Sequence, residues 1–363
     1  MAEKIYRILS INPGSTSTKI AVYENEQELF QKTVTHDGQE LAGYKLMVDQ
    51  LAMRQKAIAE CLKQLDFPLA SLSAVAGRGG KLPPLVRGAY RITKSMVDFL
   101  TYHPIDEHAS NLGAIIAHSI AAPLGIPSFI YDAVVVDELE DVARLSGVPE
   151  LKRKASCHVL NMRAVALKTA QKMGRRLDEL NVVVCHMGGG ITATVIQNGR
   201  MIDVLTDEEG PFSPERAGRV PCRQLVDLCF SGKHDRSSAT KRMRGHGGLL
   251  AYLGTNNALE VEKRIKQGDQ SAELIYQGMA YQVAKGVGEL ATVVSGNVDV
   301  IILTGAIAHS RLFTGWVVDR VQFIAPVVIV PGENELEALA LGTLRVLRGE
   351  EEAREFVEPQ QGI

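Results

Sequence analysis

The sequence predicts a duplicated α/β fold with a mixed sheet and helices in each half. Two distant segments, residues 8–23 and residues 182–196, each contain an apolar strand, a turn rich in glycine or hydroxyl groups, and a second strand. Strand patterns open each half and then alternate with helical patterns. The length of 363 residues is too great for one average core and fits two domains.

The first half is expected to open with strands over residues 4–36, which turn at Gly14 and again around residues 24–26. An apolar stripe at helical spacing predicts a helix over residues 41–65. The other elements expected here are a strand over 74–76, a helix over 107–121 and a strand over 128–132.

The second half is expected to begin with a helix over residues 155–177, which leads into the second strand–turn–strand segment. Asn198-Gly199 is a strong hairpin signal, so a third strand follows it. A polar stretch over residues 231–248 is expected to be mobile. The other elements expected are helices over 222–230, 258–267, 270–294 and 334–347, and strands over 300–303 and 327–330.

The domain boundary is expected near residue 150, where Gly147-Val148-Pro149 interrupts the pattern. No low-complexity linker separates the halves, so we expect them to share an interface and a hinge. The predicted domains are residues 1–150, completed by the C-terminal helix at about residues 333–363, and residues 151–332.

Composition excludes several classes of protein. A hydrophobic content of 45% and a mean hydropathy of +0.01 are ordinary for a globular chain. The net charge of −2 gives no electrostatic reason to expect nucleic acid or a membrane surface as partner. No signal peptide is visible, and no apolar run approaches the ~20 residues of a membrane span. The 5 cysteines form no C-x-x-C pair, so we interpret them as reduced, mostly buried thiols of a cytoplasmic protein without a zinc site.

The first turn suits phosphate oxygens, because a tight turn between strands presents backbone N–H groups. Gly14, Ser15 and Ser17 are expected to bind phosphate, with Asn12 near a metal ion and Lys19 reaching in. The alternative is a hairpin in which these residues serve the turn alone.

The second turn follows His186 and contains Gly188, Gly189 and Gly190. Three glycines bring nothing to a core and cost backbone entropy, so a ligand close to the backbone is expected. His186 is a candidate phosphate donor, although a histidine at the end of a strand is often merely structural. Because the two turns repeat one design, they favour a site that holds a nucleotide's phosphates between the halves.

Four further side chains are candidates for chemistry. Arg78 and Arg216 lie near glycines in expected loops and suit a carboxylate or phosphoryl group, unless they are ordinary surface arginines. Asp132 ends an apolar strand, where α/β sheets place ligands, and it would hold Mg²⁺ or simply cap a helix. His158 lies on an expected helix among apolar neighbours, which by itself indicates a core histidine.

Two sites near the C-terminus are less specific. Thr304-Gly305-Ala306 follows a buried strand and suits an adenosine, but it is also a common strand–helix turn. Glu333 and Glu335 are at the start of the last helix, where either a metal ion or the helix dipole explains them.

These motifs together resemble the acetate kinase family, of the actin-like and sugar-kinase-like ATPase superfamily, and more closely its butyrate kinase branch. Residues 12–19 are similar to the family's first signature, residues 186–190 to its second phosphate loop, and residues 303–307 to its adenosine turn. The resemblance runs nearly end to end. It implies duplicated ribonuclease H-like (actin-like ATPase) domains, each with a mixed five-stranded sheet, and an active site in the cleft between them.

The resemblance also implies roles for individual residues. Arg78 and Arg216 resemble the arginines that hold the substrate carboxylate and the transferring phosphoryl group, Asp132 the essential aspartate, and His158 the transition-state histidine. The phosphate and metal region is matched by Asn12, Ser15, Ser17 and Lys19, and Gly305 matches the glycine beneath the adenine.

The chain departs from the acetate kinase pattern at four places. Around Arg78 a longer histidine-rich signature is absent, and Gly189 replaces an asparagine; both differences favour the butyrate and branched-chain branch. The family's metal-binding glutamate falls near Asn334, so Glu333 or Glu335 takes over that role. Near His158, Val159-Leu160-Asn161 replaces the usual Gly-Thr-Ser.

The function implied is reversible phosphorylation of butyrate by ATP with Mg²⁺, which gives butanoyl phosphate and ADP. Isobutyrate, acetate and propionate are alternative acceptors. A different class would be an actin-like or chaperone-like nucleotide-binding protein, although such relatives have Asp where this chain has Asn12. A sugar kinase would need Asp132 as a general base. A homo-oligomer is implied by the resemblance alone.

Overall fold

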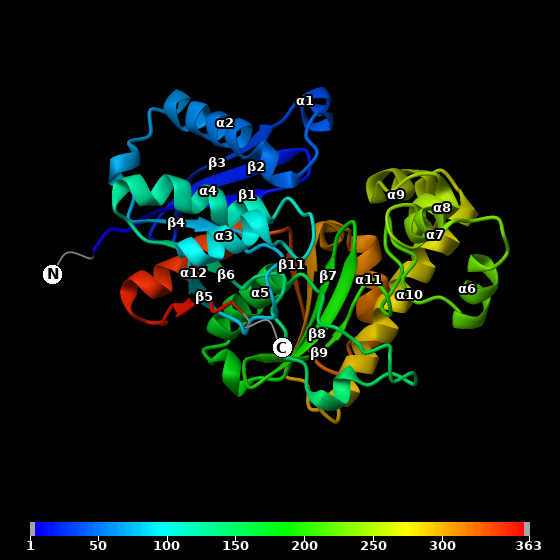
Figure 1. Ribbon diagram of the computed structural model, residues 1–363. Helices are drawn as coiled ribbons and strands as arrows, with labels where there is room; N and C mark the ends of the chain where they lie inside the picture. The colour runs from blue at the N-terminus through cyan, green and yellow to red at the C-terminus, as the bar shows by residue number, and fades with distance from the viewer. Residues whose placement is uncertain (1–3, 359–363) are drawn as a thin grey trace. The chain divides into compact units, whose positions relative to one another are not determined.

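The computed structural model describes residues 4–358 and divides the chain into two compact units (Figure 1). The first unit comprises the chain up to Asp137 and again from Asn334 onward, and the second is Glu138–Glu333. The change from the first unit to the second therefore comes earlier in the chain than residue 150, the expected position. The chain returns to the first unit with its last helix, so that unit is built from two separate segments.

The first unit contains a seven-stranded sheet in the order β12-β5-β6-β4-β1-β2-β3. β1 and β2 are antiparallel, as are β2 and β3, whereas β4 is parallel to both β1 and β6. The expected five-stranded core is present, and two short strands, β5 and β12, extend it at one edge. The strands are β1 Arg7–Pro13, β2 Ser17–Glu24, β3 Gln27–Thr35, β4 Ala74–Gly77, β5 Ala89–Arg91, β6 Ser128–Tyr131 and β12 Arg354–Glu355.

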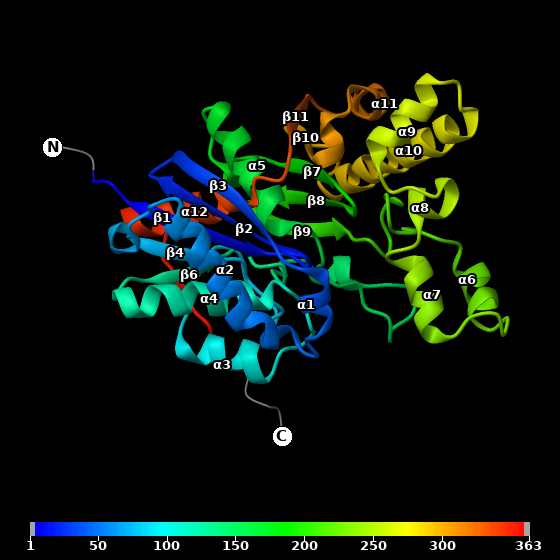
Figure 2. The same cartoon turned by 90° about the horizontal axis from the view of Figure 1, so that it is seen from above.

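Helices cover both faces of this sheet (Figure 2). Leu9 and Ile11 of β1 pack in one hydrophobic cluster with residues of α2, α3 and α4. The last helix, α12, packs against β1, β2, β4 and β6. The helices are α1 Gly38–Ala42, α2 Leu51–Gln64, α3 Lys94–Tyr102, α4 Asn111–Ala121 and α12 Glu335–Arg348.

The second unit contains a five-stranded sheet in the order β11-β10-β7-β8-β9. β7, β8 and β9 form an antiparallel meander, and β10 is parallel to both β7 and β11. Counted from the meander, this order matches β3-β2-β1-β4-β6 of the first unit, so the predicted duplication is confirmed. The strands are β7 Val182–Met187, β8 Ile191–Gln197, β9 Arg200–Leu205, β10 Val300–Gly305 and β11 Val327–Pro331.

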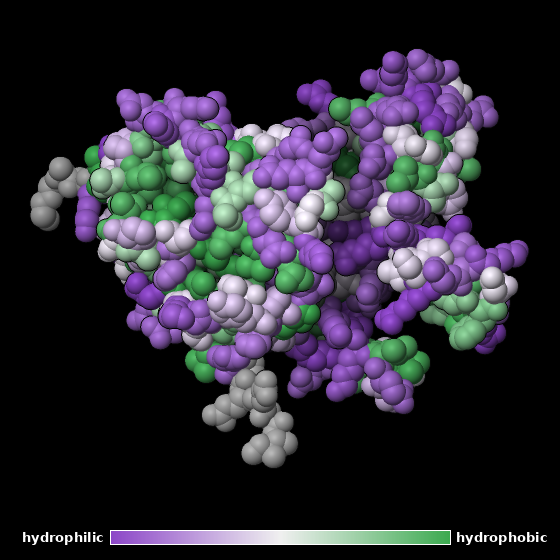
Figure 3. Space-filling model, turned by 45° about the horizontal axis from the view of Figure 1, so that its top comes forward, coloured by the Kyte–Doolittle hydropathy of each residue, from purple (hydrophilic) through white to green (hydrophobic). Residues whose placement is uncertain are grey.

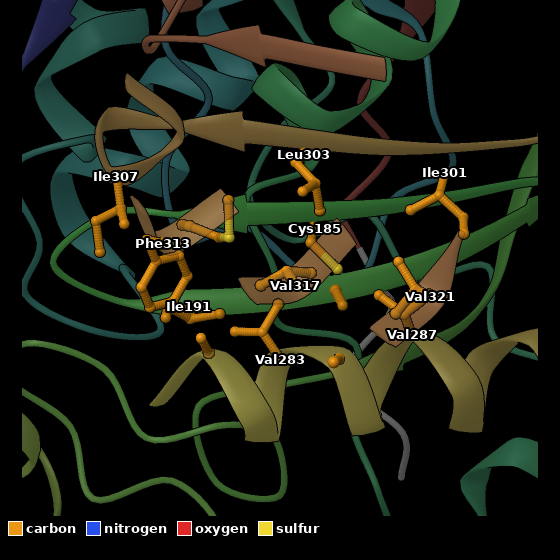
Figure 4. Close-up of a cluster of buried hydrophobic side chains, with 14 of the residues drawn as sticks. Cys185, Ile191, Val283, Val287, Ile301, Leu303, Ile307, Phe313, Val317 and Val321 are labelled. Atoms are coloured by element: carbon orange, nitrogen blue, oxygen red, sulfur yellow. The ribbon is translucent and has the colours of Figure 1, made fainter. Parts of the chain in front are cut away.

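The core of the second unit lies between its sheet and the helices α10 and α11. Cys185, Leu303 and Ile191 of the strands meet Val283 of α10 and Phe313 of α11 (Figure 4). The face of the molecule drawn in Figure 3 mixes hydrophilic and apolar areas. The helices of this unit are α5 Val159–Lys172, α6 Cys222–Cys229, α7 Arg236–Met243, α8 Gly248–Leu253, α9 Ala258–Lys266, α10 Gln270–Val293 and α11 Arg311–Val321. Over residues 4–358, no helix has both the length and the apolar character that crossing a membrane requires.

Several expected elements differ in extent. The helix expected over 41–65 is divided: α1 is capped by Asp37 and ends at Ala42, just before Gly43, and α2 begins only at Leu51. The stretch 231–248 contains α7, because the Asp235 side chain accepts from the backbone N–H of Ser238 and caps a helix there. The elements α3, α8, β5 and β12 were not expected. The expectation that the cysteines are mostly buried is wrong, since only Cys157 and Cys185 are buried.

Candidate active site

Three of the expected site residues follow parallel strands of the first unit. Asn12 is in β1, Arg78 follows β4 and Asp132 follows β6, and these three strands are neighbours. The register pairs Ile11 with Gly77 and Gly77 with Ile130, so the strands end at the same edge of the sheet. This carboxyl edge is where open α/β sheets bind ligands.

Arg78, Asn12 and Glu335 form one hydrogen-bonded group. The Arg78 Nη1 atom donates to Glu335 Oε2 at 2.7 Å and to Asn12 Oδ1 at 3.2 Å. The Asn12 amide also donates to Glu335 Oε2. Glu335 is in the first turn of α12 and is only 8% exposed. The ion pair fixes the guanidinium at the sheet edge, and both of these partners use the same carboxylate oxygen of Glu335.

Asp132 is almost fully buried and takes an unusual backbone conformation. Its φ is 42°, in the left-handed region that few residues other than glycine adopt. Its carboxylate accepts a hydrogen bond from the backbone N–H of Gly88 at 2.8 Å. Asp132 therefore does not cap a helix, because residues 133–136 form none. Strain of this kind clusters at functional sites.

The first turn lies between β1 and β2. Gly14 donates its N–H to the carbonyl oxygen of Ser17 at 2.7 Å, and Ser15 and Lys19 are exposed. A Cβ on Gly14 would meet nothing closer than 3.4 Å, and its φ is not positive. Neither packing nor backbone conformation therefore requires glycine at position 14. The close approach of a ligand is the candidate explanation that is left.

The glycine loop of the second unit lies against Arg216. A Cβ on Gly190 would come within 2.3 Å of the Arg216 Nη1 atom, whereas one on Gly189 would meet nothing closer than 3.8 Å. Ser213 ties the loop down by donating to the Gly189 carbonyl at 2.8 Å. Arg216 Nη1 is 3.6 Å from Asp207 Oδ2, and burial lowers the pKa of the Arg216 guanidinium.

His158 and His186 stack on one another, with ring centroids 3.9 Å apart and an angle of 12° between the planes. His158 precedes α5 rather than lying on a helix, and its Nδ1 is 2.8 Å from Thr192 Oγ1. His186 is buried, and its Nδ1 is 2.9 Å from the Asn161 amide. The two stacked rings are therefore held in place by polar neighbours next to the glycine loop. His158 contacts polar groups and does not lie among apolar neighbours alone, as a core histidine would.

Gly305 and Glu333 complete the group in the second unit. Gly305 has a φ of 91°, and a Cβ there would lie 2.4 Å from the Met187 carbonyl oxygen, so only glycine fits. The Glu333 carboxylate is 3.8 Å from His186 Nε2. Glu333 and Glu335 thus belong to different units and different groups of residues.

Asn161, Thr192 and Asp207 hold the candidate residues in place, and the sequence did not single them out. Each is polar and lies within or directly after a stretch with an apolar pattern, but such a pattern does not show which neighbour a side chain meets. Within residues 4–358, no group of three or more His, Cys, Asp or Glu side chains is placed to hold a metal ion.

Comparison with known proteins decides the family. The model of the acetokinase family matches residues 95–324. The chain is 49% identical over 353 residues to butyrate kinase 2 of Clostridium acetobutylicum, covering 97% of this chain and 99% of that protein. The chain belongs to the acetokinase family. It is therefore an enzyme, a phosphotransferase with a carboxyl group as acceptor.

Solved structures agree with the fold. Acetate kinase of Porphyromonas gingivalis matches with a TM-score of 0.77 at 19% identity, covering 94% of this chain and 100% of that chain. A propionate kinase of Francisella tularensis matches with a TM-score of 0.73 at 16% identity, covering 93% of this chain and 98% of that chain. The actin-like ATPase fold expected from the sequence is thus confirmed.

Proposed function

We propose that this protein transfers the γ-phosphoryl group of ATP to butyrate, reversibly, and so forms butanoyl phosphate and ADP. The observation that carries the proposal is the 49% identity to butyrate kinase 2, which spans 97% of this chain. The positions of Arg78 and Arg216 support the proposal, because neither is a free surface side chain. Arg78 is paired with Glu335, and Arg216 lies against Gly190 of the glycine loop.

The acceptor needs no general base. A carboxylate is already ionised at neutral pH, with an ordinary pKa near 4–5. Asp132 is therefore proposed to orient groups rather than to remove a proton, and a sugar kinase, which must activate a neutral hydroxyl, is disfavoured.

The main obstacle is repulsion between two anions. Arg78 and Arg216 are proposed to neutralise the acceptor carboxylate and the charge on the phosphoryl oxygens as it grows in the transition state. His158, stacked on His186, is proposed to donate to the same oxygens. Because these side chains are already held by neighbours, they need little reorganisation during the reaction.

The nucleotide is proposed to bind the second unit, with its phosphates at Gly188, Gly189 and Gly190 and its adenosine at Gly305. Backbone N–H groups in such loops suit anions. Gly14, Ser15, Ser17 and Lys19 of the first turn are proposed as further phosphate contacts.

The residues Asn12, Asp132 and Glu335 suit Mg²⁺, because hard oxygen donors are its preferred ligands. Glu335 is favoured over Glu333, since it contacts Asn12 through one carboxylate oxygen and has the other to offer. Mg²⁺ usually keeps several waters and uses one or two carboxylates, so the lack of a larger acidic cluster within residues 4–358 does not argue against it. When bound, it would neutralise phosphate charge.

Acetate, propionate and isobutyrate remain alternative acceptors, since one methylene in an apolar pocket is worth only ~1–3 kcal/mol. We place the reaction in the cytoplasm, where ATP is available, and leave a homo-oligomer as an expectation from the family.

The test is ATP-dependent acyl phosphate formation, trapped with hydroxylamine, across acetate, propionate, butyrate, isobutyrate and valerate. We expect the highest kcat/KM at four carbons and a loss of about 10²-fold or more in Arg78→Ala and in Arg216→Ala. A maximum at acetate would reject butyrate as the substrate. No acyl phosphate with any acid, despite ATP binding, would reject the proposed function and leave an actin-like nucleotide-binding protein.

A further inference from the structure

Arg54 is a buried cation with no acidic partner among residues 4–358. It is in α2, it is 0% exposed, and its hydrogen bonds within those residues all go to neutral oxygens. Both Nε and Nη2 donate to the side chain of Gln50, at 3.1 and 2.8 Å. Burial lowers the pKa of Arg54, and no described carboxylate acts against that effect. An arginine nevertheless stays charged, and an uncompensated buried charge is costly.

The other contacts of Arg54 all reach the first turn. Its Nη2 donates to the carbonyl oxygen of Ser15 at 3.0 Å. Its Nη1 donates to the carbonyl oxygen of Ser17 at 3.2 Å and to the hydroxyl of Thr18 at 3.0 Å. The Thr18 hydroxyl also lies 2.8 Å from Nε2 of the buried His36, whose backbone N–H donates to the Thr16 carbonyl at 3.0 Å.

These contacts use the carbonyl oxygens of the turn as acceptors, whereas two backbone N–H groups of the turn have no acceptor among the described residues. The carbonyls of Ser15, Thr16 and Ser17 all accept hydrogen bonds, whereas no described residue accepts from the N–H of Ser15 or Thr16. Both of these residues are exposed. Exposed N–H donors beside a buried positive charge are an arrangement that binds anions.

We propose that Arg54 is a positioning residue that shapes the first turn and supplies the positive charge that a bound phosphoryl group compensates. The inference rests on the proposed function, because the anion is the phosphate of ATP or of the acyl phosphate. Arg54 acts on the turn through its hydrogen bonds to the carbonyl oxygens of Ser15 and Ser17. Because Arg54 is buried in a medium less polar than water, its positive charge is screened little.

The test compares Arg54→Met, Arg54→Gln and Arg54→Lys with the wild type in steady-state kinetics. We expect Arg54→Met to raise KM for ATP or for butanoyl phosphate at least tenfold, with KM for butyrate, which carries no phosphate, changed less than twofold. Arg54→Lys should have a KM for that substrate at least threefold lower than Arg54→Met, and Arg54→Gln should not. Equal behaviour of the lysine and glutamine variants would contradict the role of charge.

Ile58→Ala is the matched control, because Ile58 lies one turn along α2, is also 0% exposed and has an aliphatic side chain that cannot donate to the turn. It should lower the melting temperature and leave each KM unchanged. If the Arg54→Met kinetics match this control, the inference is wrong.

A binding measurement separates this inference from the proposed function. ATP and inorganic pyrophosphate should each raise the melting temperature of the wild type, and at equal ligand concentration this shift should be smaller in Arg54→Met and restored in Arg54→Lys. A shift of wild-type size in Arg54→Met, or no shift in the wild type, would overturn the inference. A wild type that binds ATP but makes no acyl phosphate would overturn only the proposed function.

Discussion

At the residue scale, glycines in this protein matter where another group needs their space. Gly190 leaves room for the Arg216 guanidinium, and Gly305 leaves room for the Met187 carbonyl. Gly189 is open on its outer side, because a Cβ there would have its nearest neighbour 3.8 Å away. The same glycine run therefore combines a packing role with a position open to a ligand.

Gly190→Ala should displace Arg216 and lower kcat/KM about 10²-fold, the usual effect of losing one group that stabilises charge in a transition state. Because a guanidinium at the end of a flexible side chain can move aside, the melting temperature should change little. Steady-state kinetics with ATP and butyrate would measure the effect.

The double variant of Gly190→Ala with Arg216→Ala is the control. If Gly190 acts through Arg216, the double variant should be no worse than Arg216→Ala alone, because the two changes remove the same interaction. Losses that multiply would show that Gly190 has a separate role.

The cysteines differ in reactivity for a physical reason. Burial raises the pKa of both Cys157 and Cys185 to about 12, so their thiols stay protonated at neutral pH. Cys222 and Cys229 are exposed. Iodoacetamide at pH 8 should therefore label Cys222 and Cys229 in the native protein, and Cys157 and Cys185 only after unfolding. Peptide mass spectrometry would detect this, and labelling of native Cys157, next to His158, would contradict it.

At the element scale, strand ends bring candidate site residues together. Asn12, Arg78 and Asp132 come from three neighbouring strands, and α12 adds Glu335 from the far end of the chain. α12 is seated closely on the sheet: a Cβ on Gly342 would come within 2.4 Å of the Tyr131 ring, in the residue before Asp132. The packing of this helix therefore sets the position of Glu335.

Gly342→Ala should destabilise the protein by about 1–3 kcal/mol, because a methyl group would overpack the contact with Tyr131. Gly288→Ala in α10 is the matched control, since nothing lies within 4 Å of a Cβ there. It should stabilise by about 0.5–1 kcal/mol, the helical advantage of alanine over glycine. Thermal unfolding would compare the two, and equal melting temperatures would contradict this explanation of how α12 is seated.

Elements with a regular pattern could be predicted from the sequence, and capped or short ones could not. The meanders at Gly14 and at Asn198-Gly199 and the long helix α10 are predicted nearly to their ends. α3 is not predicted, although Thr93 caps it by accepting from the backbone N–H of Met96. α5 begins at Val159, four residues later than its apolar pattern indicates. Local pattern shows where a helix is favoured, and tertiary hydrogen bonds such as His158 to Thr192 decide where it begins.

The candidate site residues could be named from the sequence, but which of them lie together, and with which partners, is seen only in the structure. Sequence motifs indicate Arg78 and Arg216 as candidates. The partner of Arg78, Glu335, lies far from it in the chain, whereas Asp207 lies in the same segment as Arg216, between β9 and α6, where local spacing does not show that the two side chains meet. The roles of Asn161 and Arg54 depend on contacts across the fold, which spacing along the sequence does not contain.

At the scale of the whole molecule, the two units repeat one strand order, and each carries its own glycine or serine turn and its own arginine. This duplication agrees with the proposed reaction between two anionic partners, since each unit offers groups of a kind that suits anions. The central claim is that ATP and a carboxylate are those partners.

The most direct measurement is ³¹P NMR of the wild-type protein with ATP, Mg²⁺ and butyrate. We predict that an acyl phosphate signal grows as the γ-phosphoryl signal of ATP falls, and that neither changes when butyrate is left out or when Arg78→Ala replaces the wild type. Conversion of ATP to inorganic phosphate alone, or no use of ATP by the folded protein with any short acid, would contradict the claim.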